Sequence, residues 1–438
     1  MRSRSVLVGI VLPLFVLAGR AEAQSAPGYG RITLFGNYMQ TTRNDGGPNS
    51  SYTEISALVN VVSKTADDGG FEYALDARGA EYPSESQTNR VSLYNAWLGG
   101  RISGGGLGLR VGQMWLNDLG GLGAVGGVQL EARPFAPSKN LQFRVGLFGG
   151  LEPDLYQVGY VKNVKKYGGY VALDGERGWK NVLGYVLIKN QSVTERSVVT
   201  MLNFIPIGKE FFLYQAAEID TTGPAGSGGG PGVTYMFVNA RYQPAAWVEL
   251  QGLYHHGRSI DTRSIAQDIL NGRPVDPRAL DGFLFGSIGG RVTFMPVPSV
   301  RIWGGYAQEQ SSREGEDYPR IQAGISVTNL FGSGLDLTAS DNRYNRPSTG
   351  SYDSIYASIG RNIGSRFYLT LDYTTSLSVL SLTNSDGVVV QSRPRSKRYA
   401  ASGVVNLSRA FSLLLTAEQL RDDDVRQLRT LAGITFRF

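Results

Sequence analysis

Apolar and polar residues alternate with a period of two along most of the chain, in segments of about 8 to 11 residues. In one of them Phe367, Leu369 and Leu371 alternate with Tyr368, Thr370 and Asp372. The clearest segments are 71–78, 107–112, 141–147, 287–294 and 367–374. A period of two is typical of β-strands with one apolar face, whereas a helix would repeat every 3.6 residues. The pattern therefore predicts an all-β protein.

The breaks between these segments are of two kinds, and in the C-terminal half the two kinds take turns. Short breaks lie at 243–245, 331–333, 363–365 and 408–410. Long polar breaks lie at 41–51, 221–232, 257–282, 311–317 and 376–396. Short turns at one end and longer loops at the other are typical of a transmembrane antiparallel β-barrel in the outer membrane. A soluble β-sandwich has no reason to sort its loops by end, so we predict the barrel.

The chain holds about 22 or 23 candidate strands, and bacterial barrels have an even number. Segment 151–169 is ambiguous, and counting 155–161 within a loop gives a best count of about 22. If some hairpins protrude beyond the membrane, 16 or 18 strands remain open. A 22-stranded barrel normally holds a plug. The strand pattern begins near Tyr29, so we expect no plug domain.

The last strand ends in a ladder of alternate residues. It comprises Leu428, Thr430, Ala432, Ile434, Phe436 and Phe438. This ladder resembles the final-strand signature of outer-membrane barrels, which implies that Phe436 and Phe438 are an assembly signal read by the barrel-assembly machinery. Unpaired backbone groups in lipid cost several kcal/mol each, so we expect this strand to pair with the first, near 31–39.

The N-terminus reads as a secretory signal. Arg2 and Arg4 precede an apolar run of about 13 residues, and the small-residue stretch Ala21-Glu22-Ala23 follows. This is the order of a cleavable signal peptide, and the run is shorter than the roughly 20 residues that a transmembrane helix needs. We expect a signal peptide over 1–23, a barrel over 24–438 and localisation in the outer membrane.

Composition excludes other classes. The chain has no Cys, so an exported disulfide-stapled domain is excluded. The hydrophobic content of 42% is low for a helical membrane protein but suits a barrel, in which alternate residues face lipid. The net charge of +6 falls to about +4 when three Arg and one Glu leave with the signal, which does not indicate a nucleic-acid partner.

Charged residues on the polar face of the strands are predicted to line the pore, because Arg facing lipid costs about 2–4 kcal/mol at the bilayer midplane. They are Glu72, Asp76, Arg78, Arg110, Arg144, Arg291, Asp372 and Glu418. Both signs occur. The arginines either brace the wall by pairing with carboxylates or give a modest preference for anions.

No catalytic, cofactor or metal site is predicted, and we expect no enzyme. The two histidines, His255 and His256, are adjacent and would point to opposite faces of a strand, although Ser259 and Asp261 lie near them. The Gly-rich run 226–232 lacks the Lys-Ser/Thr and the helix of a phosphate loop. The acidic run 422–424 is expected in an outer loop, either as a solvated surface or as a place for divalent cations that bridge lipopolysaccharide.

Two stretches resemble bacterial porins: Val91-Ser92-Leu93-Tyr94-Asn95-Ala96-Trp97-Leu98-Gly99-Gly100, and LGLRVGQ at 107–113. The resemblance implies passive passage of solutes, a constriction loop folded into the barrel, and a homotrimer. The candidate for that loop is 257–282, the longest break, in which 264–270 could form a short helix. The alternative is a loop that stands outside the barrel.

Three functions remain open at this stage. The first is a porin-like channel for small hydrophilic solutes. The second is a conduit for export of polysaccharide or another polymer, and the third is a sealed barrel that serves as a structural or surface anchor. In each case the expected partners are outer-membrane lipid, lipopolysaccharide and the assembly machinery.

Overall fold

A computed structural model describes residues 28–438 except 64–69, 84–86, 103, 137–139, 155, 224–230, 276–278, 280–281, 313, 347–349 and 384–388. The expected signal peptide, its cleavage site before Gln24 and most of the Gly-rich run lie outside the described residues. Within the described part of the chain, no helix has both the length and the apolar character needed to cross a membrane.

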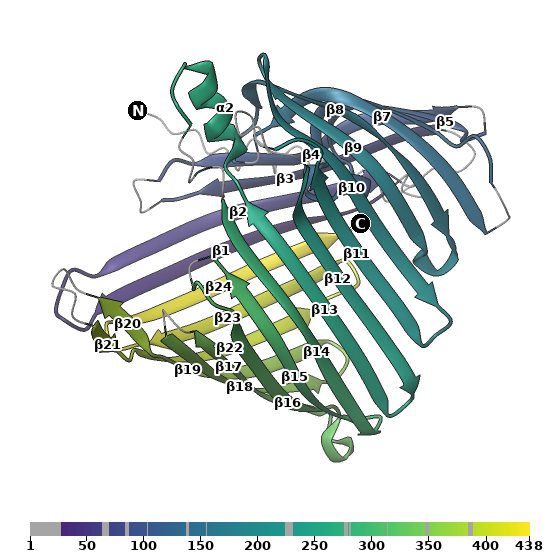
Figure 1. The fold of residues 1–438 in the computed structure, drawn as a ribbon. Coiled ribbons are helices and arrows are strands. Elements are labelled where there is room, and N and C mark those ends of the chain that lie inside the picture. Colours follow the sequence, from purple (N-terminus) through teal and green to yellow (C-terminus); the bar gives the residue numbers. More distant parts are fainter. Residues whose placement is uncertain are drawn as a thin grey trace.

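The protein is a single closed antiparallel barrel of 22 strands (Figure 1). Each strand pairs with its neighbour along the chain, and β1 closes the barrel on β24 with Arg31 opposite Arg437 and Arg43 opposite Val425. The strands are β1 (Gly28–Arg43), β2 (Ser50–Ser63), β3 (Gly70–Glu81), β4 (Arg90–Ile102), β5 (Leu107–Trp115), β6 (Ala124–Ala132), β7 (Leu141–Pro153), β8 (Tyr160–Gly175), β9 (Lys180–Asn190), β10 (Val193–Ile207), β11 (Phe211–Asp220), β12 (Gly232–Ala245), β13 (Val248–Ser259), β14 (Phe283–Val297), β15 (Val300–Ser311), β16 (Tyr318–Val327), β17 (Leu335–Arg346), β18 (Gly350–Ile363), β19 (Phe367–Ser378), β22 (Arg395–Asn406), β23 (Phe411–Arg421) and β24 (Val425–Arg437).

The predicted count of about 22 strands is confirmed. In the ambiguous segment, β7 ends at Pro153 and β8 begins at Tyr160, so no separate strand lies between them in the described residues, whereas 160–161 belong to β8 and not to a loop. One extra hairpin, β20 (Leu380–Thr383) with β21 (Val389–Ser392), pairs outside the 22-stranded sheet. The remaining elements are short: α2 (Thr262–Leu270), and the 3₁₀ turns η2 (Asn117–Leu122), η3 (Glu176–Gly178) and η4 (Leu330–Gly332).

The period of two in the sequence separates the two faces of the barrel wall. Leu98, Leu147 and Ile288 are exposed by 60%, 60% and 61%, and they stand on the outer face. On β7, Arg144 alternates with such residues and is buried. An apolar outer face and a polar inner face are what a wall between lipid and a water-filled interior requires.

The two ends of the barrel differ, as the sequence predicts. We call the end where β1 begins and β24 ends the terminal end, and the opposite end the loop end. The turns 246–247, 298–299 and 364–366 lie at the terminal end. The long connections 221–231, 260–282 and 379–394 lie at the loop end, where α2 stands in Figure 1.

Candidate functional site

The connection between β5 and β6 folds into the barrel and fills one side of it. Leu116, Leu119 and Leu122 are buried, with Leu119 only 1% exposed. They belong to the one buried apolar cluster found among the described residues, and its wall residues come from the inner faces of β5 to β10. We call residues 116–123 the inner segment. The apolar patch on the inner face of the wall is therefore complementary to the apolar side chains of the inner segment.

Local sequence explains how the inner segment turns and docks. Three leucines spaced by three residues suit a chain with about three residues per turn. Gly120 has φ 57° and ψ −131°, a conformation open essentially only to glycine, and it kinks the segment. On the wall, a Cβ at Gly184 of β9 would lie 2.4 Å from Cδ2 of Leu119. The absence of a side chain at Gly184 therefore makes room for Leu119.

Sequence reasoning missed the inner segment. The signal that could have found it is the run Leu116-Asn117-Asp118-Leu119-Gly120-Gly121-Leu122, in which the period of two stops although apolar residues continue. The candidate constriction loop at 257–282 takes a different position. Its helix, α2, packs on β9 and β10, with Ile265 and Ala266 buried. Because α2 follows the loop end of β13, it stands at the mouth of the barrel.

An ion pair joins α2 to the wall. Arg263 contacts Glu195 of β10 at 3.0 Å and Glu152 of β7 at 2.5 Å. Lys166 of β8 lies 3.7 Å from the same Glu152. Asp261 caps the helix by accepting a hydrogen bond of 3.0 Å from the backbone N–H of Ser264. The two ion pairs of Arg263 therefore tie α2 to two strands, β7 and β10.

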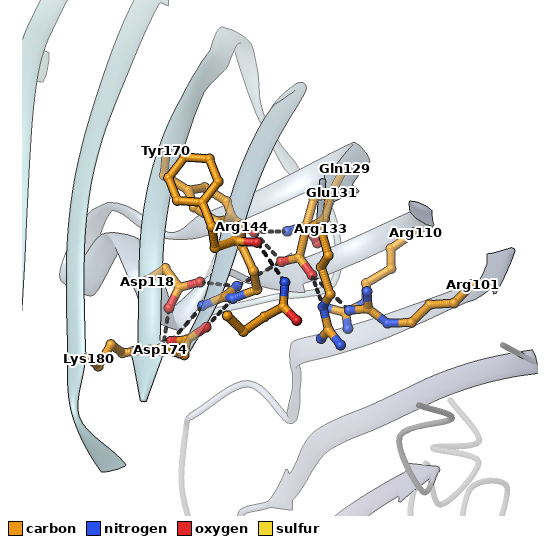
Figure 2. A network of polar contacts seen from close by, with 12 residues as sticks. Arg101, Arg110, Asp118, Gln129, Glu131, Arg133, Arg144, Tyr170, Asp174 and Lys180 are labelled. Atoms are coloured by element: carbon orange, nitrogen blue, oxygen red, sulfur yellow. Dashed lines mark hydrogen bonds and ion pairs between the residues drawn. The ribbon is translucent and has the colours of Figure 1, made fainter. Parts of the chain in front are cut away.

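A charged network surrounds the inner segment, and Arg144 is its centre (Figure 2). The Arg144 guanidinium donates to Asp118 of the inner segment at 2.9 Å, to Glu131 of β6 at 2.8 Å and to Asp174 of β8. Lys180 contacts the other oxygen of Asp118 at 2.5 Å. A buried charge is tolerated only when it is paired and hydrogen-bonded, and each carboxylate here meets at least one cation.

The network continues around the wall through Arg101 of β4. Arg101 contacts Glu131 at 2.8 Å and Glu72 of β3 at 3.1 Å. Glu72 also accepts from Arg110 of β5 at 3.0 Å, and Arg110 stacks over Trp97 with 4.5 Å from its guanidinium carbon to the ring centroid. Sequence reasoning did not single out Arg101 and Glu131, because their role depends on ion-pair partners that lie on other strands.

The eight predicted residues all carry their side chains on the inner side of the wall, but the structure groups them differently. Glu72, Arg110 and Arg144 belong to the network around the inner segment. The others make local contacts: Arg78 with Glu54 at 2.5 Å, Asp76 with Asn60 at 3.2 Å, Asp372 with Tyr356 at 2.7 Å, and Glu418 with Arg398 at 2.7 Å. Of the two roles considered for the arginines, Arg78, Arg110 and Arg144 have the contacts of wall bracing.

Arg291 of β14 differs from these arginines. It forms no ion pair within the described part of the chain, and its Nε has no hydrogen-bond partner there. Its register neighbours are Gln251 of β13 and Gly305 of β15, neither of which is charged. Its positive charge is therefore available to the interior.

Asp118 lies outside the spanning strands, and its contacts set its ionisation. Burial would raise the pKa of this carboxyl, but hydrogen bonds and charge interactions with Arg144 and Lys180 outweigh it and lower the pKa below its ordinary value. On α2, burial opposes the charged form of Arg263, whereas Glu195 and Glu152 raise its pKa. Both groups therefore remain charged at neutral pH.

Two cavities follow the inner wall beside the inner segment. One, of about 280 Å³, separates Gly120 and Gly121 from Tyr214 and Glu218 of β11 and Tyr235 of β12. The second, of about 370 Å³, lies nearer the loop end, where Thr262 of α2 contributes to its lining. Glu218 and Tyr235 line both cavities, so the two spaces adjoin at these residues.

The weaker chemical candidates from the sequence have ordinary surroundings. His255 packs among aromatic rings, and Asp261 caps α2. In the acidic run, Asp422 accepts from the backbone N–H groups of Asp424 and Val425, as in a tight turn. In the described residues, no group of three or more His, Asp or Glu side chains is arranged to hold a metal ion.

At the seam of the barrel, Phe438 and Gly30 exchange backbone hydrogen bonds of 3.1 and 2.9 Å. The Phe436 ring lies 4.8 Å from Phe411 and 5.6 Å from Phe438, measured between ring centroids. The predicted pairing of the first and last strands is confirmed, and the terminal ladder faces outward.

A closed 22-stranded barrel with an apolar outside, a polar inside and an inward-folded connection has the architecture of a transmembrane β-barrel. No protein-family model matches the sequence, and a search of curated proteins finds no match. Solved structures of similar fold include Pseudomonas aeruginosa OpdQ, with 10% identity, a TM-score of 0.45, and 94% of this chain and 98% of that chain covered. Acinetobacter baumannii OccAB4 has 9% identity, a TM-score of 0.44, and coverage of 95% and 99%.

Proposed function

We propose that this protein is an outer-membrane channel through which small hydrophilic solutes diffuse. The barrel wall separates an apolar outer face from a charged and hydroxyl-bearing inner face, and all 22 strands are paired. Such a wall is stable only with lipid outside and water or polar groups inside. The terminal end would face the periplasm and the loop end the exterior, with lipid and lipopolysaccharide around the outer face.

The main observation behind the proposal is that the inner segment fills the interior of the barrel along one part of the wall. The inner segment and its apolar cluster occupy the inner faces of β5 to β10. The inner face from β16 to β23 is instead half-exposed and rich in hydroxyls, which pair across strands. Ser326 with Thr338 and Ser402 with Thr416 lie at 3.2 Å, and Ser376 with Ser396 at 2.9 Å. A passage beside this wall favours a channel over a sealed anchor.

Single-channel conductance of residues 24–438, refolded and inserted in a planar bilayer, tests the proposal. Steady ohmic steps support an open channel for ions and small solutes. Silence from protein whose folding is shown by heat-modifiable gel migration overturns the proposal and favours a sealed barrel. Loss of a surface polymer on gene deletion, with no effect on solute uptake, would instead favour the export conduit.

A further inference from the structure

Aromatic side chains form a row on the inner wall from β10 to β14. Ring centroids lie 4.6 Å apart between Phe204 and Phe212, and 5.7 Å apart between Tyr214 and Phe237. Phe237 lies 6.1 Å from His255, and His255 in turn contacts Phe285 of β14. All of these side chains are neither fully buried nor fully exposed. These rings lie outside the buried apolar cluster around the inner segment, so packing against that segment does not explain them.

The row passes from one end of the barrel toward the other. Phe212 is the second residue of β11, next to the turn 208–210 at the terminal end. At its other end, His255 lies 5.0 Å from Phe285, and Phe285 lies 6.2 Å from Phe283, the first residue of β14. Because β11 and β14 run in opposite directions, their first residues lie at opposite ends. A solute that follows the row therefore passes along the inner face of the barrel from one end to the other.

The row also borders the two cavities beside the inner segment. Tyr214 and Tyr235 line the cavity that faces Gly120 and Gly121. Tyr235 lies 5.9 Å from His255 between ring centroids, and with Phe285 it lines the adjoining cavity. Rings of the row thus line both cavities beside the inner segment.

Hydrogen-bonding groups accompany the rings. Gln251 donates to Asn239 at 2.9 Å, and Ser287 donates to Glu309 at 3.1 Å. In the register, Asn239 stands opposite Tyr214, and Ser287 stands opposite His255. Each of these polar pairs is therefore within one strand of a ring.

We propose that this row is a binding track for neutral saccharides, which cross the channel along it. The proposal rests on the channel function and names the solute class. A pyranose ring presents C–H groups on its faces and hydroxyls around its rim, so it needs flat apolar surfaces next to donors and acceptors. Rings in a row, with amide and hydroxyl groups beside them, provide both. Glu218 and Glu309 beside the track are paired with Arg196 and Arg320, each at 3.2 Å, so these charges are compensated and the amide and hydroxyl groups are left to meet a neutral solute.

Transient blockage of single-channel current by maltohexaose, a neutral chain of six glucose units, tests the track. We expect concentration-dependent closures in the wild-type protein. Loss of two rings in the double variant Tyr235→Ala/Phe237→Ala should raise the half-blocking concentration about tenfold. The matched control is Tyr254→Ala, which removes an outward-facing ring from β13 beside His255 and should leave blockage unchanged.

The outcomes separate the two proposals. A protein that conducts ions but is not blocked by maltohexaose overturns the saccharide track and leaves the channel function standing. Blockage by benzoate that depends on the same two rings, without blockage by maltohexaose, also overturns the saccharide class. A folded protein that conducts nothing overturns the channel function itself. A single variant, Phe237→Trp, keeps a ring at the centre of the row and should retain blockage, which guards against a general effect of altering β12.

Discussion

Arg144 on β7 donates a hydrogen bond of 2.9 Å to Oδ2 of Asp118, which lies in the connection between β5 and β6 (Figure 2). The same guanidinium also contacts Glu131 and Asp174 on the wall. One side chain therefore ties the inner segment to β6 and β8. Because the inner segment narrows the barrel, the strength of this tie sets how steady the passage is.

Acid should loosen the inner segment through Asp118. Its pKa is lowered in the folded protein, so its contribution to stability is present above the unfolded value, about 3.9, and is lost as the pH falls through the folded value. We expect steady current between pH 5 and pH 8, and added current noise only below about pH 4. Asp118→Asn should show this noise already at neutral pH. Quiet current from Asp118→Asn at pH 7 would contradict the assignment.

Gly184 and Leu119 should behave as a coupled pair. Gly184→Ala places a Cβ 2.4 Å from Leu119 and 2.5 Å from Oγ1 of Thr200, so the inner segment must move and the conductance must change. Leu119→Ala removes the nearer obstacle, and the double variant should return part of the way to the wild-type conductance. Gly252→Ala is the control, since nothing lies within 4 Å of its Cβ. Strictly additive effects in the double variant would argue against direct contact.

The position of α2 should depend on Arg263. Arg263→Ala leaves Glu195, whose side chain is 2% exposed, without this partner, and removes the bridge to Glu152. We expect faster cleavage of the 260–282 connection by an added protease, with the barrel still folded. Arg273→Ala is the matched control, because its ion pair with Asp268 is 4.0 Å long and exposed. Equal cleavage rates for the two variants would show that the bridge does not hold α2.

Sequence reasoning predicted the wall and missed what lies inside it. Alternation indicates which side chains face lipid, so the barrel and its strand count could be predicted from the residues. The inner segment could not, because Leu116, Leu119 and Leu122 carry no period of two and their partners are far along the chain. The same holds for Arg101, whose role depends on Glu72 and Glu131.

The residue pattern in 257–282 predicted that a helix forms there, but it did not predict where that helix packs. The expected helix, 264–270, is observed as Thr262–Leu270. Whether that helix entered the barrel depended on Glu152 and Glu195, more than 60 residues away, so local sequence could not decide it.

Arg291 and Arg110 should contribute unequally to ion selectivity. Arg110 already pairs with Glu72 at 3.0 Å, whereas Arg291 has no ion pair among the described residues. An uncompensated charge acts on passing ions over roughly one Debye length, about 8 Å at physiological salt, while a paired charge is largely cancelled. Arg291→Gln should therefore shift the reversal potential in a salt gradient toward cation selectivity. Arg110→Gln leaves Glu72 with Arg101 as a partner and should shift it less. The measurement is made at low and at high salt, and the Arg291→Gln shift should shrink at high salt because the field is screened. If the two variants shift the potential equally, the field in the lumen is set by the whole charged wall rather than by Arg291.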